Sequence, residues 1–381
     1  MNKLYVGTVF SGIGAPEQAL RKLGVQHEVL FACDNGERVP KISDEDFRKT
    51  VLSLPPKDRE RKIVEIYNSA GDNLMELSYK VNYGIRNSRF YQDIKFLDGK
   101  DFHGKLDLLV GGSPCQAFSC NGKRGGFADT RGTLFYEYAR IINEAQPKSF
   151  IFENVKGMLT HDSRRTWQTI KNVFEELNYT IYIQKDKNGY ESPILNACDY
   201  GIPQNRMRIY VVGIRNDIKL STPFKFPEPI ELKRFVPFYL EPEVPASYYL
   251  GQKGFEFVTT HPTRAKVGSY DMTGANGTVG WIMNCQKANQ QFNWNGDFIF
   301  EDMSSKHTPE ILKRAYVGEW HGRKGVVRKF TPRECLRLMG FPDSFVQCVD
   351  DNTMYRQSGN SMVVDVVSKL IQEIINSGAL E

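Results

Sequence analysis

Short apolar runs alternate with amphipathic segments at the start of the chain. Lys3 to Phe10 is typical of a buried strand, Pro16 to Leu23 of a helix, and Glu28 to Cys33 of a second strand. Proline in the first turn of that helix and Gly24 just past its end agree with these boundaries. Strand, glycine-bearing turn, helix and strand make a βαβ unit, which predicts the opening of a doubly wound sheet.

The same alternation continues after residue 100. It predicts further strands at 106–110, 149–153, 179–184 and 207–214. It also predicts helices at 133–145 and from about Arg164 to Leu177. Alternating strands and helices indicate the α/β fold class, so we expect a doubly wound, Rossmann-like domain.

Two stretches interrupt this rhythm. Residues 38–88 are dense in charge and only weakly periodic, and we interpret them as a helical, solvated insertion rather than as part of a site. Residues 218–325 are rich in Pro, Gly, Asn and aromatic residues without a steady period, which predicts a smaller, loop-rich domain with short strands. Beyond it, Thr331 to Leu338 and Met362 to Ile375 are predicted to be amphipathic helices.

Composition limits the class of protein. A chain of 381 residues, 40% of them hydrophobic, can form a large core and a second domain. The net charge of +5 permits a nucleic-acid partner without requiring one. Seven cysteines with no C-x-x-C pair argue against a disulfide framework and against a zinc site, so we expect no metal. The sequence contains no apolar run of about 18 residues and no signal-peptide pattern, so we expect a cytoplasmic protein.

Cys115 stands where an enzyme would place a nucleophile. The segment 111–119, Gly-Gly-Ser-Pro-Cys-Gln-Ala-Phe-Ser, stops the strand at 106–110 and leaves the cysteine at its carboxyl end. Ligands of open α/β sheets bind beyond these strand ends. Taken alone, this thiol fits either a buried structural cysteine or a catalytic group.

A glycine-containing turn and two carboxylates suit a nucleotide-like cofactor. Gly12 and Gly14 follow the first strand and allow a sharp turn close to a ligand, although an ordinary tight turn has the same pattern. Asp34 ends the second strand and is suited to ribose hydroxyls. Asp93 follows a third strand-like patch and can accept an adenine amino group. A surface acidic residue is the alternative for both.

Glu153 and two arginines add charge at other strand ends. Glu153 closes the apolar run 150–155 and is expected to share a crevice with Cys115, where partial burial lets a carboxyl hold or donate a proton. Residues 204–208 lead into the strand that continues through 209–212, and its period of two predicts that Arg206 and Arg208 lie on one face. Two guanidiniums pointing the same way suit a carboxylate or phosphate, and a solvated strand end is the alternative.

These residues resemble the C5-cytosine DNA methyltransferases, and the chain is most similar to the compact bacterial members of restriction–modification systems. The matching segments follow the family's order: 10–14, 111–119, 153–155, 197–203, 204–208, 328–342 and 357–361. Pro-Cys-Gln and Glu-Asn-Val in this order and spacing are a highly specific combination. The resemblance covers about 1–35, 90–216 and 326–378, whereas 218–325 matches only in place and length.

The resemblance implies a mechanism. Cys115 would add as the thiolate to C6 of a cytosine flipped out of the duplex. Glu153 would hydrogen-bond N3 and the exocyclic amine, and Arg208 the base carbonyl, with Arg206 supporting that pocket and the thiolate. C5 would then take the methyl group of S-adenosylmethionine, and loss of the C5 proton would release the cysteine.

The resemblance also assigns a cofactor site, and basic and amide side chains supply candidate DNA contacts. The residues expected around S-adenosylmethionine are Phe10, Ser11, Gly12, Gly14, Asp34, Asp93, Pro114, Asn360 and Ser361. The candidate DNA contacts are Ser119, Lys123, Arg124, Arg131, Arg264, Gln290 and Arg323. The expected domains are a catalytic and cofactor-binding domain (1–217), a target-recognition domain (218–325) and a C-terminal segment (326–381) whose last helix packs back on the first domain.

Three hypotheses follow from the sequence. The first is a sequence-specific DNA (cytosine-5-)-methyltransferase that protects host DNA from a cognate restriction endonuclease without forming a complex with it. The second is a tRNA cytosine-C5 methyltransferase on the same scaffold, and the third is a non-catalytic DNA-binding protein. The large 218–325 region favours DNA over tRNA, and the presence of Cys115 and Glu153 argues against the binder. We expect a monomer that acts on double-stranded DNA and has no membrane partner.

Overall fold

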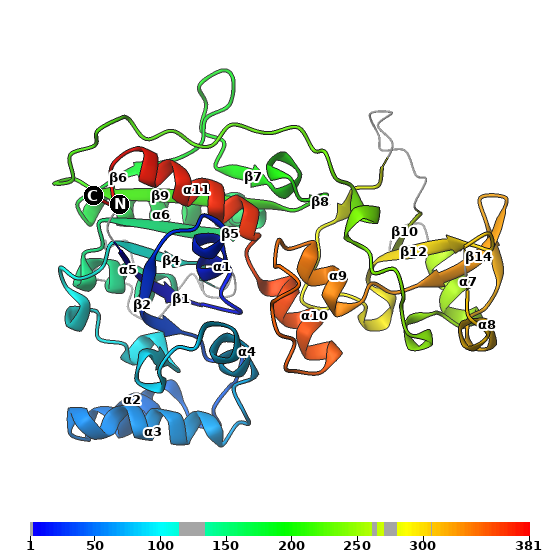
Figure 1. Cartoon of the computed structure of the whole chain (residues 1–381). Coiled ribbons are helices and arrows are strands. Elements are labelled where there is room, and N and C mark those ends of the chain that lie inside the picture. The colour runs from blue at the N-terminus through cyan, green and yellow to red at the C-terminus, as the bar shows by residue number, and fades with distance from the viewer. Residues whose placement is uncertain (1–2, 114–133, 261–264, 270–279, 306) are drawn as a thin grey trace. The chain divides into compact units, whose positions relative to one another are not determined.

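The computed structural model describes residues 3–113, 134–260, 265–269, 280–305 and 307–381. The chain forms two compact units, coloured along the sequence in Figure 1. The first unit comprises Met1–Leu195, Arg208–Pro227 and Val367–Glu381, and the second comprises Asn196–Met207 and Glu228–Val366. The structural division therefore departs from the expected domain limits in three ways. Asn196–Met207, expected in the first domain, belongs to the second unit, and residues 218–227, expected in the target-recognition domain, belong to the first unit. The expected C-terminal segment is divided after Val366.

Within the described residues, eight strands form the sheet of the first unit. Their spatial order is β3-β2-β1-β4-β5-β9-β6, with β7 beside β9. The bounds are β1 Leu4–Val9, β2 His27–Cys33, β3 Phe90–Tyr91, β4 Leu108–Gly111, β5 Ser149–Val155, β6 Tyr179–Tyr182, β7 Ile194–Asn196 and β9 Met207–Arg215. The pairs from β3 to β5 are parallel, and β9 runs antiparallel to both β5 and β6. The predicted α/β, doubly wound fold class is confirmed.

Helices cover both faces of this sheet. In Figure 1, α1 (Ala15–Lys22) and α11 (Val364–Asn376) lie in front of it, and α5 (Leu134–Ala145) and α6 (Arg165–Glu176) lie behind it. The aromatic rings of α5 and α6 pack against those of β5, as in the pair Phe150–Phe174 with ring centroids 4.8 Å apart. Strands covered on both faces are apolar throughout, which is why short apolar runs predicted them correctly.

The strand order reverses between β1 and β4. These two strands are parallel neighbours, with Val9 opposite Gly111. The segments that follow them therefore start side by side at one edge of the sheet, where open α/β sheets bind ligands. The Phe10–Gly14 turn and the segment leading to Cys115 begin at this place.

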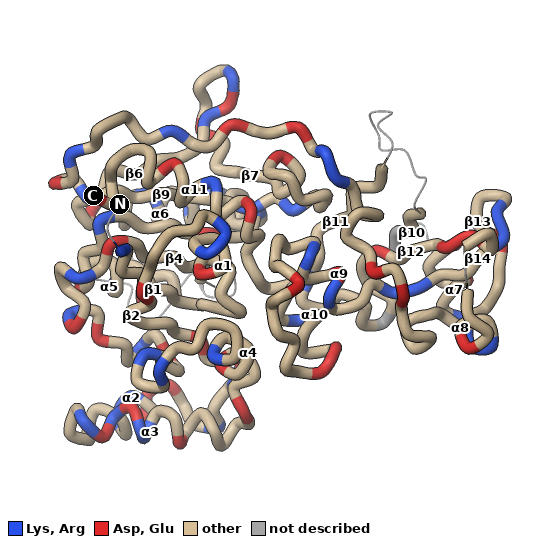
Figure 2. The backbone as a smooth tube through the Cα atoms, viewed as in Figure 1, with Lys and Arg blue, Asp and Glu red and all other residues tan. Residues whose placement is uncertain are grey.

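The insertion at 38–88 is helical, as predicted, and contains three α-helices. They are α2 (Asp44–Leu52), α3 (Pro56–Asn68) and α4 (Leu74–Tyr83). Figure 2 shows Lys and Arg interspersed with Asp and Glu along α2 and α3. The inner faces are apolar, because Phe47, Val51, Ile63 and Tyr67 form a buried cluster. Only the outer faces are solvated, and this explains the weak periodicity of the segment.

The described part of the second unit contains two small sheets. The larger has the order β10-β12-β14-β13, and β8 pairs with β11. The strands are β8 Gln204–Asn205, β10 Ala265–Ser269, β11 Met283–Asn284, β12 Gly296–Asp302, β13 Gly318–Trp320 and β14 Arg323–Arg328. The helices are α7 Gln252–Thr260, α8 Pro309–Arg314, α9 Pro332–Arg337 and α10 Asp351–Asn360. The short strands predicted within 218–325 are present. None of the helices in the described ranges of the whole chain has the length and hydropathy needed to span a bilayer.

A buried ion cluster joins β12, β14 and α9 in this unit. The Arg328 side chain is fully buried, and its two terminal nitrogens each lie 2.9 Å from an oxygen of Glu334. Its Nε donates to Glu301 over 2.5 Å. Glu334 also completes the capping box of α9 with Thr331, so a single carboxylate caps the helix and neutralises the arginine. Removal of the guanidinium would leave two carboxylates without their cation.

We expect Arg328→Met to lower the free energy of unfolding by about 3–5 kcal/mol, the cost typical of an uncompensated buried charge. Urea denaturation followed by tryptophan fluorescence measures this, because Trp281, Trp294 and Trp320 lie in the same unit. Arg314→Met, at an exposed position of this unit, is the control and should change stability by about 0.5 kcal/mol or less. A similar small loss for Arg328→Met would contradict the structural role of the cluster.

Candidate active site

The end of β5 holds the last described residues before Pro114. The Asn154 side-chain amide donates a hydrogen bond of 2.7 Å to the carbonyl of Ser113. A Cβ atom at Gly112 would lie 2.6 Å from the carbonyl oxygen of Glu153 and 2.9 Å from its Oε2, so only glycine permits this approach. The segment that carries the predicted nucleophile therefore starts against Glu153. Its predicted residues Pro114, Cys115, Ser119, Lys123, Arg124 and Arg131 lie outside the described residues.

Glu153 pairs with Arg208 across neighbouring antiparallel strands. Arg208 lies opposite Val155 in the β5–β9 register, two positions beyond Glu153. Its Nε lies 3.3 Å from Glu153 Oε1, and the two side chains are 15% and 14% exposed. A largely buried carboxylate and guanidinium thus converge at the edge where β4 ends. Such a pair can orient a planar, polar substrate, because the carboxylate accepts hydrogen bonds and the guanidinium donates them.

Arg206 has a different setting from Arg208. Its side chain is 3% exposed and donates to three main-chain carbonyls, at 2.7 Å to Gln286, 3.0 Å to Gly359 and 2.7 Å to Ser361. The prediction that both guanidiniums share one anion is wrong. Arg206 lies between β8 and β9, so the period of a single strand does not extend across it. Its supporting role in a base pocket stays a prediction.

Hydrogen bonds connect the Phe10–Gly14 turn to the end of β2. The Ser11 hydroxyl accepts a 2.9 Å hydrogen bond from the Cys33 N–H, and the Ser11 N–H donates to the Cys33 carbonyl over 3.1 Å. The Asp34 carboxylate accepts from the N–H groups of Gly12 and Gly36, both at 2.8 Å. Burial raises the pKa of this carboxyl. Hydrogen bonds therefore join the glycine turn to Asp34, and their role in a cofactor site stays a prediction.

Gly14 is required for a reason that the sequence did not indicate. Its φ is +79°, and a Cβ there would lie 2.1 Å from the ring of Tyr83. The Tyr83 hydroxyl donates to the carbonyls of Ile13 at 3.0 Å and Gly14 at 2.6 Å. The close approach that demands glycine is thus to helix α4 of the insertion, whereas the sequence pointed to a ligand. Contact of Gly14 with a cofactor stays a prediction.

Asp93 is buried, so the alternative of a surface acidic residue is wrong. It is 6% exposed. Its Oδ1 accepts from the N–H of Lys95 at 3.0 Å, and its Oδ2 accepts from the hydroxyl of Tyr67 at 2.8 Å. Burial raises the pKa of Asp93. These two hydrogen bonds fix the orientation of the Asp93 carboxylate at the end of β3, so it can accept a further hydrogen bond only from defined directions.

The insertion reaches the ends of β2 and β3, so its interpretation as solvated is wrong for its inner face. Tyr67 of α3 contacts Asp93, and the Asn73 side chain donates to the carbonyl of Asp34 over 2.9 Å. Sequence analysis missed both residues, because it relied on the periodicity of hydrophobic positions. The hydroxyl of Tyr67 and the amide of Asn73 do not contribute to that periodicity. Tyrosines at 67, 79 and 83 within a charged segment were the available signal.

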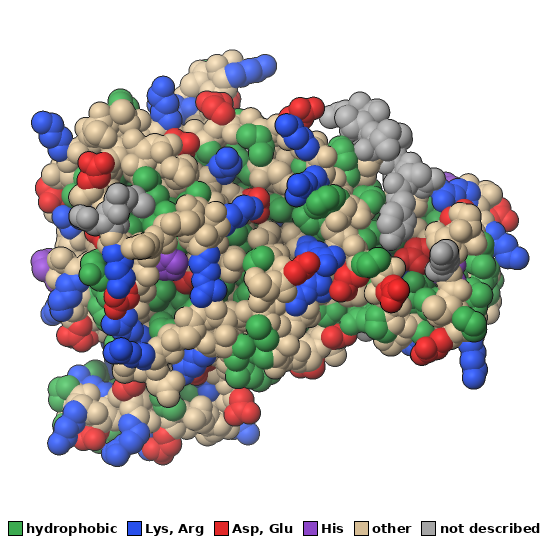
Figure 3. All heavy atoms as spheres, in the orientation of Figure 1, with side chains coloured by type: hydrophobic (Ala, Val, Ile, Leu, Met, Phe, Trp, Pro, Cys, Tyr) green, Lys and Arg blue, Asp and Glu red, His purple; other side chains and the backbone are tan. Residues whose placement is uncertain are grey.

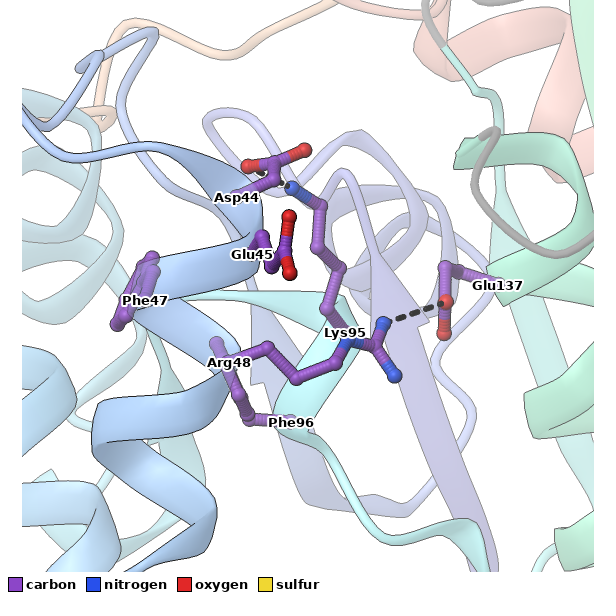
Figure 4. Close-up of a pocket in the computed structure, with 7 residues that line it drawn as sticks. All are labelled: Asp44, Glu45, Phe47, Arg48, Lys95, Phe96 and Glu137. Carbon is purple, nitrogen blue, oxygen red and sulfur yellow. Dashed lines mark hydrogen bonds and ion pairs between the residues drawn. The ribbon is translucent and has the colours of Figure 1, made fainter.

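Helix α2 of the insertion contacts the segment after β3 and helix α5, and side chains from all three line a small surface pocket of about 300 Å³. Figure 4 shows Lys95 directed at Asp44 and Arg48 at Glu137, and these pairs measure 2.8 Å and 3.9 Å. In the same pocket the rings of Phe47 and Phe96 pack with centroids 4.9 Å apart. These two ion pairs join α2 to the segment after β3 and to α5.

Glu60 lines a larger cavity of about 830 Å³ beside the same segment. The cavity also contains Ile63, Tyr91 and Tyr136. Burial, and then the nearby charges of Glu76 and Asp93, raise the pKa of Glu60 to about 7. Glu60 therefore changes its protonation state near neutral pH.

The residues predicted to contact cofactor or DNA in the second unit differ in their exposure. Asn360 is exposed at the end of α10, and Ser361 is buried with its carbonyl bonded to Arg206. The prediction that Gln290 contacts DNA is wrong, because this residue is 1% exposed and its side chain packs against Gly296. Arg323 is partly exposed and pairs with Asp302 at 3.1 Å.

Arg264 lies outside the described residues, so its assignment as a DNA contact stays a prediction. On the face drawn in Figure 3, Lys and Arg side chains are scattered among acidic ones. Among the described residues, no group of three or more His, Cys, Asp or Glu side chains could hold a metal ion.

Comparison with known proteins gives one consistent result. A family model described as C-5 cytosine-specific DNA methylase matches residues 59–376. The Type II methyltransferase M.HpaII of Haemophilus parainfluenzae is 36% identical over 317 residues, which are 81% of this chain and 82% of the relative. M.HhaI of Haemophilus parahaemolyticus, also described as a Type II methyltransferase, is 33% identical over 324 residues, 82% and 88% of the two chains.

Solved structures share the fold at low sequence identity. The S. pombe Dnmt2 methyltransferase has a TM-score of 0.62 and 19% identity, covering 98% of this chain and 99% of that one. A prophage-encoded protein from E. coli, titled a putative DNA modification methyltransferase, has a TM-score of 0.54 and 18% identity, with the same coverage. These similarities support the fold alone.

The raised pKa of Glu60 predicts a pH-dependent stability. Because the folded-state pKa of about 7 exceeds the unfolded value near 4.3, ionised Glu60 destabilises the fold, and this penalty grows as pH rises from about 4 to 7. Glu60→Gln should therefore gain stability over the wild type by about 2.5 kcal/mol more at pH 8 than at pH 5. Urea denaturation followed by circular dichroism at both pH values measures the difference. Glu65→Gln, an exposed neighbour on α3, should show no such difference, and equal behaviour of the two variants would disprove the assignment.

The two arginines should differ in stability. Arg206→Met leaves three carbonyls without their donors and should lower the free energy of unfolding by about 2–4 kcal/mol. Arg208→Met removes an ion pair in which both side chains keep about 15% of their exposure, and a smaller loss of about 1–2 kcal/mol is expected. Urea denaturation compares the two variants, and equal losses would argue against the separate roles.

Proposed function

The chain belongs to the C-5 cytosine-specific DNA methylase family, and on that basis we propose that it methylates carbon 5 of cytosine within a specific sequence of double-stranded DNA. The observation that carries the proposal is the Glu153–Arg208 pair beside the segment leading to Cys115, at the edge where the strand order reverses. A carboxylate and a guanidinium placed there suit the polar edge of a cytosine.

S-adenosylmethionine is the proposed methyl donor, and the residues present fit it. Two of the four lone-pair directions of the Asp34 carboxylate are occupied by Gly12 and Gly36, which leaves acceptor capacity for two ribose hydroxyls. Asp93 offers a buried, directed acceptor for an adenine amino group. The bound cofactor supplies an electrophilic methyl group.

The roles of the protein side chains follow from their chemistry. Cys115, as thiolate, forms a bond to C6 of the base, and the electron pair of the C5–C6 double bond moves so that C5 becomes nucleophilic. Glu153 accepts from the exocyclic amine and holds the ring, and Arg208 donates to the base carbonyl, where negative charge develops. After methyl transfer, loss of the C5 proton restores the double bond and breaks the bond between carbon and sulfur.

Asn154 is a positioning residue in this proposal, because its hydrogen bond to Ser113 fixes the chain directly before Pro114 and Cys115. None of these groups can reach a base inside a stacked duplex. The target cytosine must therefore leave the stack, at an unstacking cost of about a few kcal/mol.

The test is methylation of mixed genomic DNA with S-adenosylmethionine, followed by cytosine deamination and sequencing. We expect protected cytosines confined to one short motif. Cys115→Ala should abolish protection, and Glu153→Gln should slow methyl transfer by about 10²–10³-fold. Cys348→Ala, which removes another thiol, is the control and should keep full activity. Methyl transfer to tRNA with none to DNA would reject the proposal in favour of an RNA substrate, and binding of DNA without transfer would reject catalysis.

We propose further that the protein acts in the cytoplasm as a monomer on DNA and protects its motif from a restriction endonuclease. Relatives described as Type II methyltransferases, at 33–36% identity, support the protective role. A defined dimer in sedimentation of the DNA complex would contradict the monomer.

A further inference from the structure

Tyr67 of the insertion makes the only described side-chain hydrogen bond to Asp93. Its hydroxyl donates to Asp93 Oδ2 over 2.8 Å, while Oδ1 accepts the N–H of Lys95 over 3.0 Å. Each carboxylate oxygen thus has one donor and keeps acceptor capacity in a fixed direction. Rotation of the carboxyl group would break both bonds.

Tyr67 is itself held in place. It is 4% exposed, and burial, followed by the nearby Asp93, raises the pKa of its phenol, so it remains a donor. The ring of Phe47 packs edge-on against it with centroids 5.7 Å apart, and the guanidinium of Arg38 lies 5.1 Å from its ring centre. Phe47 in turn packs on Phe96, which follows Asp93 by three residues. The hydroxyl is therefore a preorganised group.

The insertion also contacts the neighbourhood of Asp34. Arg38, 7% exposed, donates from Nε to the carbonyl of Asn35 over 2.9 Å and also hydrogen-bonds Gln92, the residue before Asp93. Asn73 joins the same network, donating to the carbonyl of Asp34 and to Gln92 Oε1, both over 2.9 Å. One buried network thus links the insertion to the ends of β2 and β3.

Helix α4 extends these contacts to the segment after β1. Tyr79 donates to the buried carboxyl of Glu17, which also accepts from Thr8 over 3.0 Å. Tyr83 covers Gly14, as described above. Insertion side chains therefore contact the ends of β2 and β3 and the segment after β1, all of which carry proposed cofactor residues.

We propose that residues 38–88 complete the cofactor site, and that Tyr67 is the positioning residue through which Asp93 selects the 6-amino group of adenine. This inference rests on the proposed use of S-adenosylmethionine. A fixed carboxylate accepts from an amino group, whereas a 6-oxo purine presents a carbonyl oxygen that repels it. A carboxyl freed from Tyr67 can turn away from that oxygen, so discrimination between the two purines should fall.

The experiment is titration calorimetry with two ligands, S-adenosylhomocysteine and its 6-oxo analogue S-inosylhomocysteine. Wild type should prefer the adenine ligand. Tyr67→Phe should weaken binding of the adenine ligand by about tenfold, the effect expected from one misplaced hydrogen bond, and reduce the preference by a similar factor. Tyr190→Phe, which removes a hydroxyl from an exposed side chain, is the matched control and should bind both ligands like the wild type.

A second variant separates positioning from general damage. Asn73→Ser keeps an N-cap residue for α4 but loses the donor to the Asp34 carbonyl. It should weaken both ligands about equally and leave the preference unchanged. A merely structural effect of Tyr67→Phe would likewise lower both affinities together.

The outcomes distinguish the two proposals. If wild type binds neither ligand, the proposed cofactor and this inference both fail. If wild type binds and prefers the adenine ligand, but Tyr67→Phe keeps that preference within twofold, the inference alone is overturned. A reduced preference in Tyr67→Phe, with the Asn73→Ser preference intact, supports it.

Discussion

The first unit depends on how its buried carboxyl groups obtain hydrogen-bond donors at the ends of parallel strands. An unpartnered charge there would cost several kcal/mol, because the surroundings are largely withdrawn from water. Asp34 is satisfied by two glycine N–H groups, Asp93 by a tyrosine hydroxyl and a backbone N–H, and Glu153 lies beside an arginine. These donors come from different parts of the chain. The backbone around these strand ends is therefore arranged so that hydrogen-bond donors from distant segments reach the three carboxylates.

The insertion follows from this constraint. Asp93 without Tyr67, and the Asp34 turn without Asn73, would lose donors that the sheet itself does not provide. The three helices bury an apolar face among themselves and direct polar tips at the strand ends. A segment that resembles a solvated appendage in composition thus supplies part of the proposed site.

The second unit uses guanidinium groups in a different way. Arg206 is directed at main-chain carbonyls, two of which come from the end of α10, where the partial negative charge of the helix favours a cation. Arg328 neutralises two carboxylates within the core. Arg208, which lies only two residues beyond Arg206, faces a carboxylate at the edge of the sheet. Neighbouring arginines in one motif therefore have distinct physical tasks, which residue type alone does not distinguish.

The sequence by itself determined the main strands of the large sheet, the helices that cover it and the order of the motifs. Apolar runs such as 106–110 and the helical spacing of residues 164–177 are local, and burial on a sheet or helix face depends directly on that spacing. It also indicated that Glu153 and the Cys115 segment end neighbouring strands. Only the tertiary structure decided which partners the polar groups have. The contacts of Tyr67 with Asp93, of Tyr83 with Gly14 and of Arg206 with Ser361 join residues 26, 69 and 155 positions apart. Such contacts leave no periodic trace, because a polar side chain's partner is set by the path of the backbone in space and not by its neighbours along the chain.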